Sequence, residues 1–514
     1  MIRNNTKIRV LKDKIEIVIN EDSHIDLTYQ TDKLKVYPHT PYGGIEYQSY
    51  GILGIVNSTT AKHLIFITEV EQVGDIQDVA VYEIKKTHVI SYGSHISYEE
   101  VRCLKKFLSL PGFYISEYDL TNGDNEFVFN YKIKEKFEED TSGMYKGVSC
   151  IQGYFGNCKD GEWNLCLISR RSWKRAGTRL WMRGVDEEGN AANYVETEQI
   201  LHNQDTITRH IQVRGSIPFK WGHKVGIEYK PPLIIYNDDI TKSNDIIMNK
   251  YKNVYYMNLV QSVGYDAPIC SRFTKALIKN NYRHGYCDYN GNKVYLSQQK
   301  QKDMVEKLKP FLNEFGIFYK KNGVEEKQEG VIRTNCIDCL DRTNLVQFLI
   351  AQEVLLKQTE KMNIKDNIRL GQHLRELWYN NGNAISMQYA GTPALKKHII
   401  LDSKQTIFGT INDLSNASQR YFINRFSDGG LQTGYDMFTG RCTDMVRIRS
   451  NTGYISYALL FFTISIILIS FITKQYAGKQ SKVYGVIIGF IILYISTFLI
   501  FFKWFVDKPL YSGK

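Results

Sequence analysis

The N-terminus of this 514-residue chain lacks an apolar run, because residues 1–9 are mostly charged or polar. A secretory signal peptide needs an apolar stretch of about 7–15 residues, so we expect none here. Cysteine is also scarce, with nine residues at irregular spacings. An odd number of unevenly spaced cysteines predicts reduced thiols in a cytosolic compartment rather than a disulfide framework.

Acidic residues are in the minority, with 54 against 65 basic residues and a net charge of +11. This balance favours an anionic partner. The sequence contains no helix-turn-helix, zinc-finger or RNP pattern, so nucleic acid is not the expected partner. An anionic membrane surface fits the charge better, and protein partners cannot be read from the sequence.

Two segments near the C-terminus contain no charged residue, residues 455–473 and 483–502. Each has the length that a helix needs to cross a hydrocarbon core of about 30 Å. A short polar turn separates them, so they predict a transmembrane hairpin. The basic residues of its outer flanks weakly place the catalytic domain and both termini in the cytosol.

The remaining chain is too long for one ordinary core, so we expect two further domains. Residues 1–165 are predicted to be mainly β, with strands at 15–19, 51–56 and 63–68. Ser97 and Glu100 form a capping box for one helix, which Pro111 closes. The charged stretch 131–146 is predicted to be a loop. Residues 166–440 form the predicted catalytic domain, followed by a linker at 441–454 and a short tail at 503–514.

A single stretch, residues 333–344, carries the clearest chemistry. Five residues separate Cys336 from Arg342, which is the Cys-x5-Arg spacing of a thiolate phosphatase loop. Residues 330–332 predict the end of a buried strand, and residues 345–356 predict a helix. A strand, a tight loop and a helix in this order place the loop N–H groups where they can hold a phosphate dianion. The expected fold of this domain is therefore α/β.

Each residue type in the loop has a chemical role. Cys336 is the predicted nucleophile, with a thiol pKa lowered by arginine and the helix N-terminus. Arg342 would bind two phosphate oxygens in a bidentate fork. Asp338 is our first choice for the proton donor, and Asp341, which could instead orient the guanidinium, is the alternative. Thr343 can donate its hydroxyl to the sulfur. No metal or other cofactor is expected.

The same stretch also contains Cys-x-x-Cys, formed by Cys336 and Cys339, which could bind zinc or cycle a disulfide. The chain has no second Cys-x-x-Cys, and thiol redox chemistry does not explain Arg342. The phosphatase interpretation is therefore preferred.

The string Arg-Thr-Asn-Cys-x-Asp-Cys-Leu-Asp-Arg-Thr-Asn resembles the active-site signature of the Sac-domain phosphoinositide phosphatases. Further blocks that resemble this family lie at residues 169–199, 214–221, 388–392 and 420–438, so the resemblance covers roughly residues 51–440. It implies a Sac N-terminal domain before the catalytic domain. It also implies a phosphoinositide substrate, most of all phosphatidylinositol 4-phosphate, and an endoplasmic reticulum or Golgi membrane location for the hairpin-anchored type.

Six further residues are predicted to bind substrate. Tyr389 and Gly391 lie in a segment whose small and polar residues would let the backbone approach a headgroup, although a structural turn is an equal alternative. The other four fill the loop itself: Asn335, Ile337, Cys339 and Leu340. Two positions depart from the family pattern, Pro393 in place of glycine and Asn290 in place of histidine.

Two other functions compete with the membrane-anchored phosphoinositide phosphatase. One is a catalytically weak lipid-sensing scaffold at membrane contact sites, which the intact Cys336, Asp338 and Arg342 argue against. The other is a protein phosphatase that uses the same loop, because thiolate chemistry alone does not select a lipid.

Overall fold

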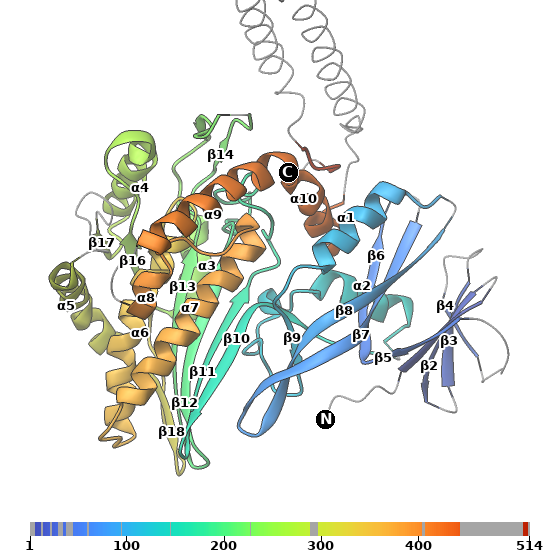
Figure 1. Cartoon of the computed structure of the whole chain (residues 1–514), viewed down its shortest axis with the longest axis horizontal. Coiled ribbons are helices and arrows are strands. Elements are labelled where there is room, and N and C mark those ends of the chain that lie inside the picture. The colour runs from blue at the N-terminus through green and yellow to red at the C-terminus, as the bar shows by residue number, and fades with distance from the viewer. Residues whose placement is uncertain are drawn as a thin grey trace, which may run out of the picture.

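The computed structural model describes residues 6–11, 14–20, 23–28, 34–37, 45–58, 61–93, 95–143, 145–226, 228–287, 297–402, 407–442 and 507–511. Most of the chain forms one long mixed sheet covered by helices (Figure 1). A smaller antiparallel sheet lies at the N-terminal end. Its strands, in the order β4-β3-β2-β1-β5, are β1 (Thr6–Val10), β2 (Lys14–Asn20), β3 (Ser23–Thr28), β4 (Leu34–Tyr37) and β5 (Ile45–Ser49).

The large sheet has the order β17-β16-β20-β13-β12-β11-β10-β9-β8-β7-β6, with β18 and β19 added beside β13. Its first strands form antiparallel pairs: β6 (Gly51–Asn57), β7 (Ala61–Ile76), β8 (Val79–Gly93), β9 (Phe113–Ser116), β10 (Ile151–Asp160), β11 (Trp163–Arg171), β12 (Val195–His202) and β13 (Thr206–Gly215). The remaining strands are β16 (Val254–Asn258), β17 (His284–Tyr286), β18 (Phe318–Lys321), β19 (Val324–Glu326) and β20 (Val331–Asn335). A separate hairpin joins β14 (Trp221–His223) to β15 (Leu233–Ile235).

Neighbouring strands β17, β16, β20 and β13 run parallel to one another. A parallel strand is buried on both faces, and β16 shows the resulting pattern. Tyr255 and Met257 pack in the core under α5–α7, whereas Val254 and Tyr256 pack in the core on the opposite face. Since side chains alternate along a strand, β16 presents apolar side chains on both faces, and helices pack against each face.

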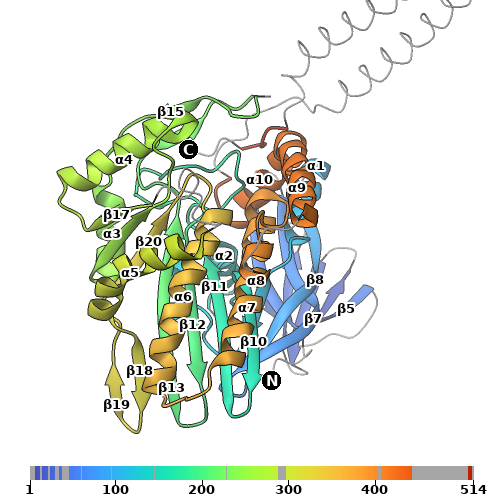
Figure 2. The same ribbon diagram turned by 60° about the vertical axis from the view of Figure 1, so that its left-hand side comes forward.

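The helices divide between the two faces of this parallel region (Figure 2). One face is covered by α5 (Gln298–Phe315), α6 (Asp341–Lys361) and α7 (Ile368–Ala390), and the other by α3 (Thr241–Tyr251) and α4 (Ala267–Lys279). The short 3₁₀ helix η2 (Gly264–Asp266) leads into α4, and α8 (His398–Asp402) and α9 (Ile407–Phe426) follow α7.

An aromatic cluster joins the N-terminal strands to the end of the catalytic region. Phe107 of α1 (Tyr98–Leu108) lies 4.6 Å from the ring of Tyr435 and 4.9 Å from that of Phe438, both in α10 (Asp428–Phe438). At Gly434 a Cβ would come within 2.4 Å of the Phe107 Cβ, so only glycine lets these helices approach so closely. The described C-terminal residues 507–511 pack here too, and the Tyr511 hydroxyl donates to the Glu100 carboxylate at 2.5 Å.

The predicted N-terminal strands and the helix capped by Ser97 are confirmed, and the Ser97 hydroxyl accepts from the Glu100 N–H. The predicted loop at 131–146 is wrong, because Tyr131–Asp140 forms α2, preceded by the 3₁₀ helix η1 (Asn125–Phe127). Ile133 and Phe137, one helical turn apart, bury its inner face, while Lys134–Glu138 and Lys136–Asp140 pair on the outside. The charges therefore mark a solvated helix face.

The large sheet continues through the predicted boundary at residue 165, which falls within β11. The division at this point stays a prediction.

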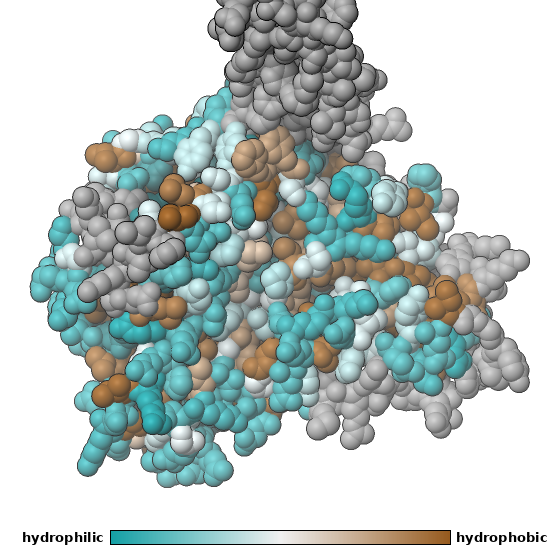
Figure 3. All heavy atoms as spheres, viewed as in Figure 1, coloured by the Kyte–Doolittle hydropathy of each residue, from teal (hydrophilic) through white to brown (hydrophobic). Residues whose placement is uncertain are grey.

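Hydrophilic residues cover most of the coloured surface, with a hydrophobic band in the region of the N-terminal strands (Figure 3).

The expected location in the endoplasmic reticulum or Golgi membrane as a multi-pass chain requires correction. Among the residues that the structure describes, no helix combines the length and apolar character needed to cross a membrane, so this prediction is not upheld. The predicted spans at 455–473 and 483–502 themselves lie outside the described residues.

Candidate active site

The loop between β20 and α6 holds the predicted signature. The strand β20 ends at Asn335, residues 336–340 turn, and α6 begins at Asp341, four residues earlier than the predicted helix. The adjacent parallel strand β16 ends at Asn258, beside Asn335. Because the carboxyl ends of parallel strands meet at one edge of a sheet, the segment after β16 lies next to this loop.

Cys336 is 2% exposed, and its N–H donates to the Cys339 sulfur at 3.3 Å. Burial raises the pKa of the Cys336 thiol, while Arg342 and the backbone N–H groups of Asp338 and Cys339 act to lower it. The expectation of a lowered pKa is therefore wrong for this conformation, because desolvation exceeds these favourable effects.

The thiol of Cys339 has a structural position. It donates to the Gly215 carbonyl at 2.8 Å, and it lies 3.1 Å from the Cys336 carbonyl. Cys339 has a φ of +51°, a left-handed conformation that non-glycine residues rarely adopt. Its contacts therefore bind the tight turn to the end of β13.

Asp338 is held by two arginines from the connection between β11 and β12. Its Oδ1 lies 2.9 Å from Nε of Arg179 and 2.8 Å from Nη2 of Arg183. Although burial acts to raise the pKa of Asp338, these two guanidinium groups hold it well below the usual range. Arg183 also donates to the Ile337 carbonyl at 2.9 Å, so one side chain grips two successive loop residues.

Arg342 faces the segment that follows β16. Its Nη1 donates to the Leu259 carbonyl at 3.3 Å, and its Nη2 lies 3.7 Å from Oδ2 of Asp266. Asp266 is 8% exposed, and burial raises its pKa despite the nearby Arg342. This carboxyl group is thus more readily protonated than an ordinary aspartate.

The second loop aspartate, Asp341, points elsewhere. Its Oδ1 accepts from the Leu395 N–H at 2.5 Å, and its Oδ2 lies 3.1 Å from Nη1 of Arg420. Arg420 also donates to the Thr392 hydroxyl and to the Pro393 carbonyl. Orientation of Arg342 was the alternative role for Asp341, and its contacts instead link the loop to α9 and the segment after α7. Of the two departures from the family pattern, Pro393 takes part in this link through its carbonyl. Asn290 lies outside the described residues.

A cavity of about 350 Å³ opens over the loop. Ile337, Asp338, Asp341 and Arg342 line one side of it. The other lining residues come from the β11–β12 connection, the hairpin of β14 and β15, η2, the segment after α7, and α9. Six of its lining residues are cationic and three are acidic: Arg179, Arg183, Lys230, Arg342, Arg420 and Arg425 against Asp266, Asp338 and Asp341. A cavity with this charge suits a multiply charged anion.

The other predicted site residues lie behind the cavity wall. Thr343 is buried, and its hydroxyl has no hydrogen-bond partner among the described residues. The Asn335 amide donates to the Gly215 carbonyl, and Leu340 packs against Tyr389 in a small buried cluster. The Tyr389 hydroxyl donates to the Met182 carbonyl at 2.7 Å. The substrate-binding roles of these residues stay predictions.

Gly391 ends α7 in the left-handed conformation, with a φ of +73°. A Cβ at this position would come within 2.7 Å of Ile423. Its position therefore agrees with the alternative of a structural turn, which glycine forms most readily.

Sequence reasoning missed several residues of the cavity, among them Asp266, Lys230, Arg420 and Arg425. Arg179 and Arg183 lie in the block at residues 169–199 that resembles the family, but the sequence assigned neither of them a role. A signal for Asp266 was present, because an acidic residue that follows a buried parallel strand lies at the edge where ligands bind. The arginines of α9 reach the site only through tertiary packing.

Comparison with known proteins identifies the family of the chain. Residues 50–304 match the SacI homology domain family. The phosphatidylinositol-3-phosphatase SAC1-B of Danio rerio is 32% identical over 473 residues, which cover 81% of this chain and 80% of that protein. The phosphatidylinositol-3-phosphatase SAC1 of Saccharomyces cerevisiae is 31% identical over 82% of this chain and 77% of its own length. The phosphoinositide phosphatase SAC6 of Arabidopsis thaliana is 29% identical over 84% of this chain and 82% of its own length.

Proposed function

Because the chain belongs to the Sac-domain phosphoinositide phosphatases and is itself a phosphoinositide phosphatase, we propose that it converts phosphatidylinositol monophosphates to phosphatidylinositol through a phosphocysteine intermediate. The observation that carries this proposal is the strongly cationic cavity over the Cys336–Arg342 loop. Its six cationic side chains outnumber the carboxylates and match a phosphorylated inositol ring better than a neutral one.

The first chemical step joins Cys336 to phosphorus. The Cys336 thiolate attacks the phosphorus atom, the P–O ester bond breaks, and the departing inositol oxygen takes a proton from a carboxylic acid. Arg342 and the loop N–H groups stabilise the charge on the phosphoryl oxygens. Water then gives a proton to the carboxylate and attacks the phosphocysteine; the S–P bond breaks, inorganic phosphate is released, and the Cys336 thiolate and the carboxylic acid are restored.

The proton donor has two candidates in this geometry. Asp338 can act only once it is protonated, which requires the incoming phosphate to compete for Arg179 and Arg183 and so to raise the Asp338 pKa. Asp266 needs no such exchange, because burial already raises its pKa and its only salt bridge among the described residues spans 3.7 Å. Asp341 is engaged by Leu395 and Arg420.

We favour the 4-phosphate as the preferred substrate on the basis of the family resemblance. Two of the similar proteins are named for the 3-phosphate, so both ring positions belong in the test. An anionic membrane surface is the proposed docking partner, since the chain has a net charge of +11 and the substrate is a lipid.

The test measures phosphate release by the full-length protein on vesicles that each contain one phosphatidylinositol monophosphate, with a chelator present. We expect release on the monophosphates, fastest on the 4-phosphate, and none from Cys336→Ser. Cys442→Ser, which changes a partly exposed thiol outside the loop, is the matched control and should retain activity. Absence of release from every lipid by folded wild-type protein would support the lipid-sensing scaffold instead. Release from phosphopeptides but not from vesicles would support a protein phosphatase.

A further inference from the structure

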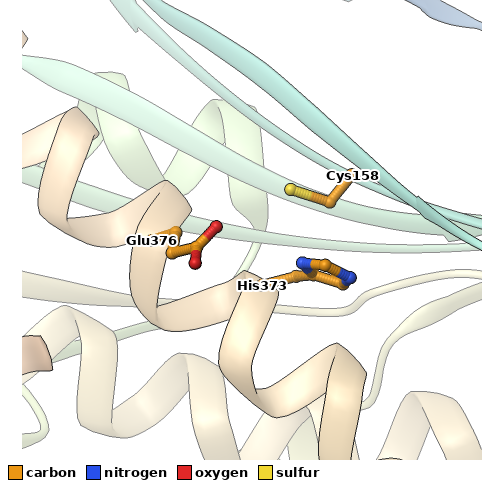
Figure 4. Close-up of side chains that lie close together, drawn as sticks. All are labelled: Cys158, His373 and Glu376. Carbon is orange, nitrogen blue, oxygen red and sulfur yellow. The ribbon is translucent and has the colours of Figure 1, made fainter.

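Three metal-ligating side chains converge on one point away from the catalytic loop (Figure 4). Cys158 lies on β10, and His373 and Glu376 lie on α7. Their ligand atoms, one sulfur, one imidazole nitrogen and one carboxylate oxygen, all lie within 4.8 Å of one another. Among the described residues this is the only group of three or more histidine, cysteine or acidic side chains with such spacing.

The fold explains the convergence. Residues three apart on a helix share one face, so His373 and Glu376 project together from α7. That helix packs directly on β10, because a Cβ at Gly156 would come within 2.9 Å of Leu377. The close approach brings Cys158, two residues further along β10, up to the same helix face.

The ligand atoms of these three side chains are not engaged by other described side chains. None of the three has a hydrogen bond or salt bridge within the part of the chain that the structure describes. Cys158 and His373 are half-buried, whereas Glu376 is exposed. The ligand atoms therefore lie close together at a place that solvent can reach.

We propose that Cys158, His373 and Glu376 form a zinc site that fastens α7 to β10. Thiolate, imidazole and carboxylate are the three protein ligand types that Zn²⁺ accepts, and a water molecule would complete a tetrahedron. Mg²⁺ and Ca²⁺ prefer oxygen ligands alone, whereas Zn²⁺ suits both a thiolate and an imidazole, so this mixed set favours Zn²⁺. Bond lengths of about 2.0–2.3 Å place tetrahedral ligands roughly 3.5 Å apart, so the side chains need to close by about 1 Å.

Zinc binding exchanges one proton for the metal ion. The S–H bond of Cys158 is replaced by a sulfur–zinc bond, one proton passes to solvent, and no electron is transferred. Burial and the neighbouring Glu376 carboxylate raise the pKa of the free thiol, so the metal-free site holds this proton. The His373 imidazole binds in its neutral form.

The site has a mechanical consequence for the catalytic region. Towards its C-terminal end, α7 carries Asn381, which donates to Asn344 of α6, and Gln388, which donates to the Gly153 carbonyl of β10. The segment after α7 then supplies the Leu395 N–H to Asp341. A metal that ties α7 to β10 therefore stabilises the helix from which this segment extends, without entering the chemistry at Cys336.

Cobalt titration tests the site independently of phosphatase activity. The full-length Cys336→Ser protein is titrated with Co²⁺, so that the loop nucleophile cannot supply the thiolate. We expect the visible bands of tetrahedral Co²⁺ and a thiolate-to-cobalt charge-transfer band that saturates at about one equivalent. Zn²⁺ should displace the cobalt and raise the Tm of the protein.

Variants of the ligands decide the outcome. Adding Cys158→Ser should remove the charge-transfer band, and adding His373→Gln should weaken binding about tenfold or more. Cys287→Ser, which changes an incompletely exposed cysteine elsewhere, is the control and should leave the titration unchanged. The Tm of each metal-free variant establishes that it folds. If Cys158→Ser does not fold, His373→Gln provides the test of the site. A band that survives both ligand variants, or no band in folded protein, would overturn the proposal.

Discussion

Nη2 of Arg183 lies 2.8 Å from Oδ1 of Asp338, while Nη1 of the same side chain donates to the Ile337 carbonyl at 2.9 Å. Arg183 is 3% exposed, so both contacts are shielded from water. A planar guanidinium can hold a carboxylate and a carbonyl at once, which a lysine ammonium cannot do in the same geometry. These two contacts of Arg183 therefore tie the loop to the connection between β11 and β12.

We therefore expect Arg183→Lys to lower kcat/KM by about 100-fold, because lysine keeps the positive charge but cannot contact the Asp338 carboxylate and the Ile337 carbonyl at once. Phosphate release from vesicles measures the effect. Arg102→Lys is the control, since the salt bridge that Arg102 forms within the described residues is an exposed one with Glu99 on α1. Equal activity of Arg183→Lys and Arg102→Lys would show that the link does not position the loop.

Replacement of Arg342 by lysine tests transition-state stabilisation. Lysine keeps the charge but loses the bidentate fork, so kcat should fall by about 10²–10³-fold while binding of the lipid changes less. The comparison of kcat with KM on the same vesicles checks this split. Arg272→Lys is the control and should match wild type, because Arg272 is exposed on α4 and its salt bridge with the exposed Asp238 spans 3.9 Å. A change confined to KM would assign Arg342 to binding alone.

The identity of the proton donor can be determined with two leaving groups. A substrate whose leaving group is already a weak base, such as p-nitrophenyl phosphate, does not need protonation in the first step, whereas an inositol oxygen does. The variant that removes the acid should lose about 100-fold or more on the lipid and little on p-nitrophenyl phosphate.

Asp266→Asn and Asp338→Asn are compared in this assay. If Asp266 is the donor, only Asp266→Asn shows the selective loss, and Asp338→Asn lowers both rates through the loop. The opposite pattern would assign the proton to Asp338. Equal losses on both substrates for both variants would exclude the two residues as donors.

The sequence reveals the loop because its function is local. The Cys336–Arg342 spacing, the preceding strand and the following helix all lie within about thirty residues, and the structure has β20 and α6 there. The family resemblance is likewise confirmed by the matching relatives. Residues close in sequence are the easiest to interpret, since backbone geometry alone brings them together.

The partners of the loop could not be predicted in the same way. Arg170, Arg179 and Arg183 look alike in the sequence, yet Arg170 pairs with buried Glu196 and Glu198, whereas the other two bind Asp338. Which arginine reaches the loop depends on how the connection from β11 to β12 folds over the sheet edge. Burial of Cys336 depends on the whole core, and for that reason the direction of its pKa shift was also mispredicted.

Asp428, at the start of α10, offers a prediction about stability and pH. It is 1% exposed, and neither carboxylate oxygen has a hydrogen-bond partner among the described residues. Nearby Lys106 donates instead to the carbonyl and hydroxyl of Ser427. Burial raises the pKa of Asp428 to about 7, with Asp507 adding to the rise and Lys106, Arg179 and Arg425 opposing it.

The sign follows from the two states. The unfolded carboxyl group loses its proton near pH 4, whereas the folded one keeps it until about pH 7. The stability that this group contributes is therefore full below about pH 4 and falls as the pH rises to about 7. Asp428→Asn removes the titration, so its Tm relative to wild type should rise between about pH 5 and pH 8. The difference should be on the order of 2 kcal/mol, or several degrees.

Thermal unfolding of the two proteins at both pH values measures this difference. Asp303→Asn on α5 is the control, because Asp303 is exposed and, among the described residues, accepts from the Gln299 side chain alone. This variant should give the same Tm difference at each pH. A buried asparagine also lacks partners at this position, so the absolute Tm of Asp428→Asn depends on that cost as well. The cost of the neutral amide does not change over this pH range, and the pH-dependent part therefore belongs to the carboxyl group. A Tm difference that is constant from pH 5 to pH 8 would show that Asp428 titrates normally and that water or a bound cation reaches it in solution.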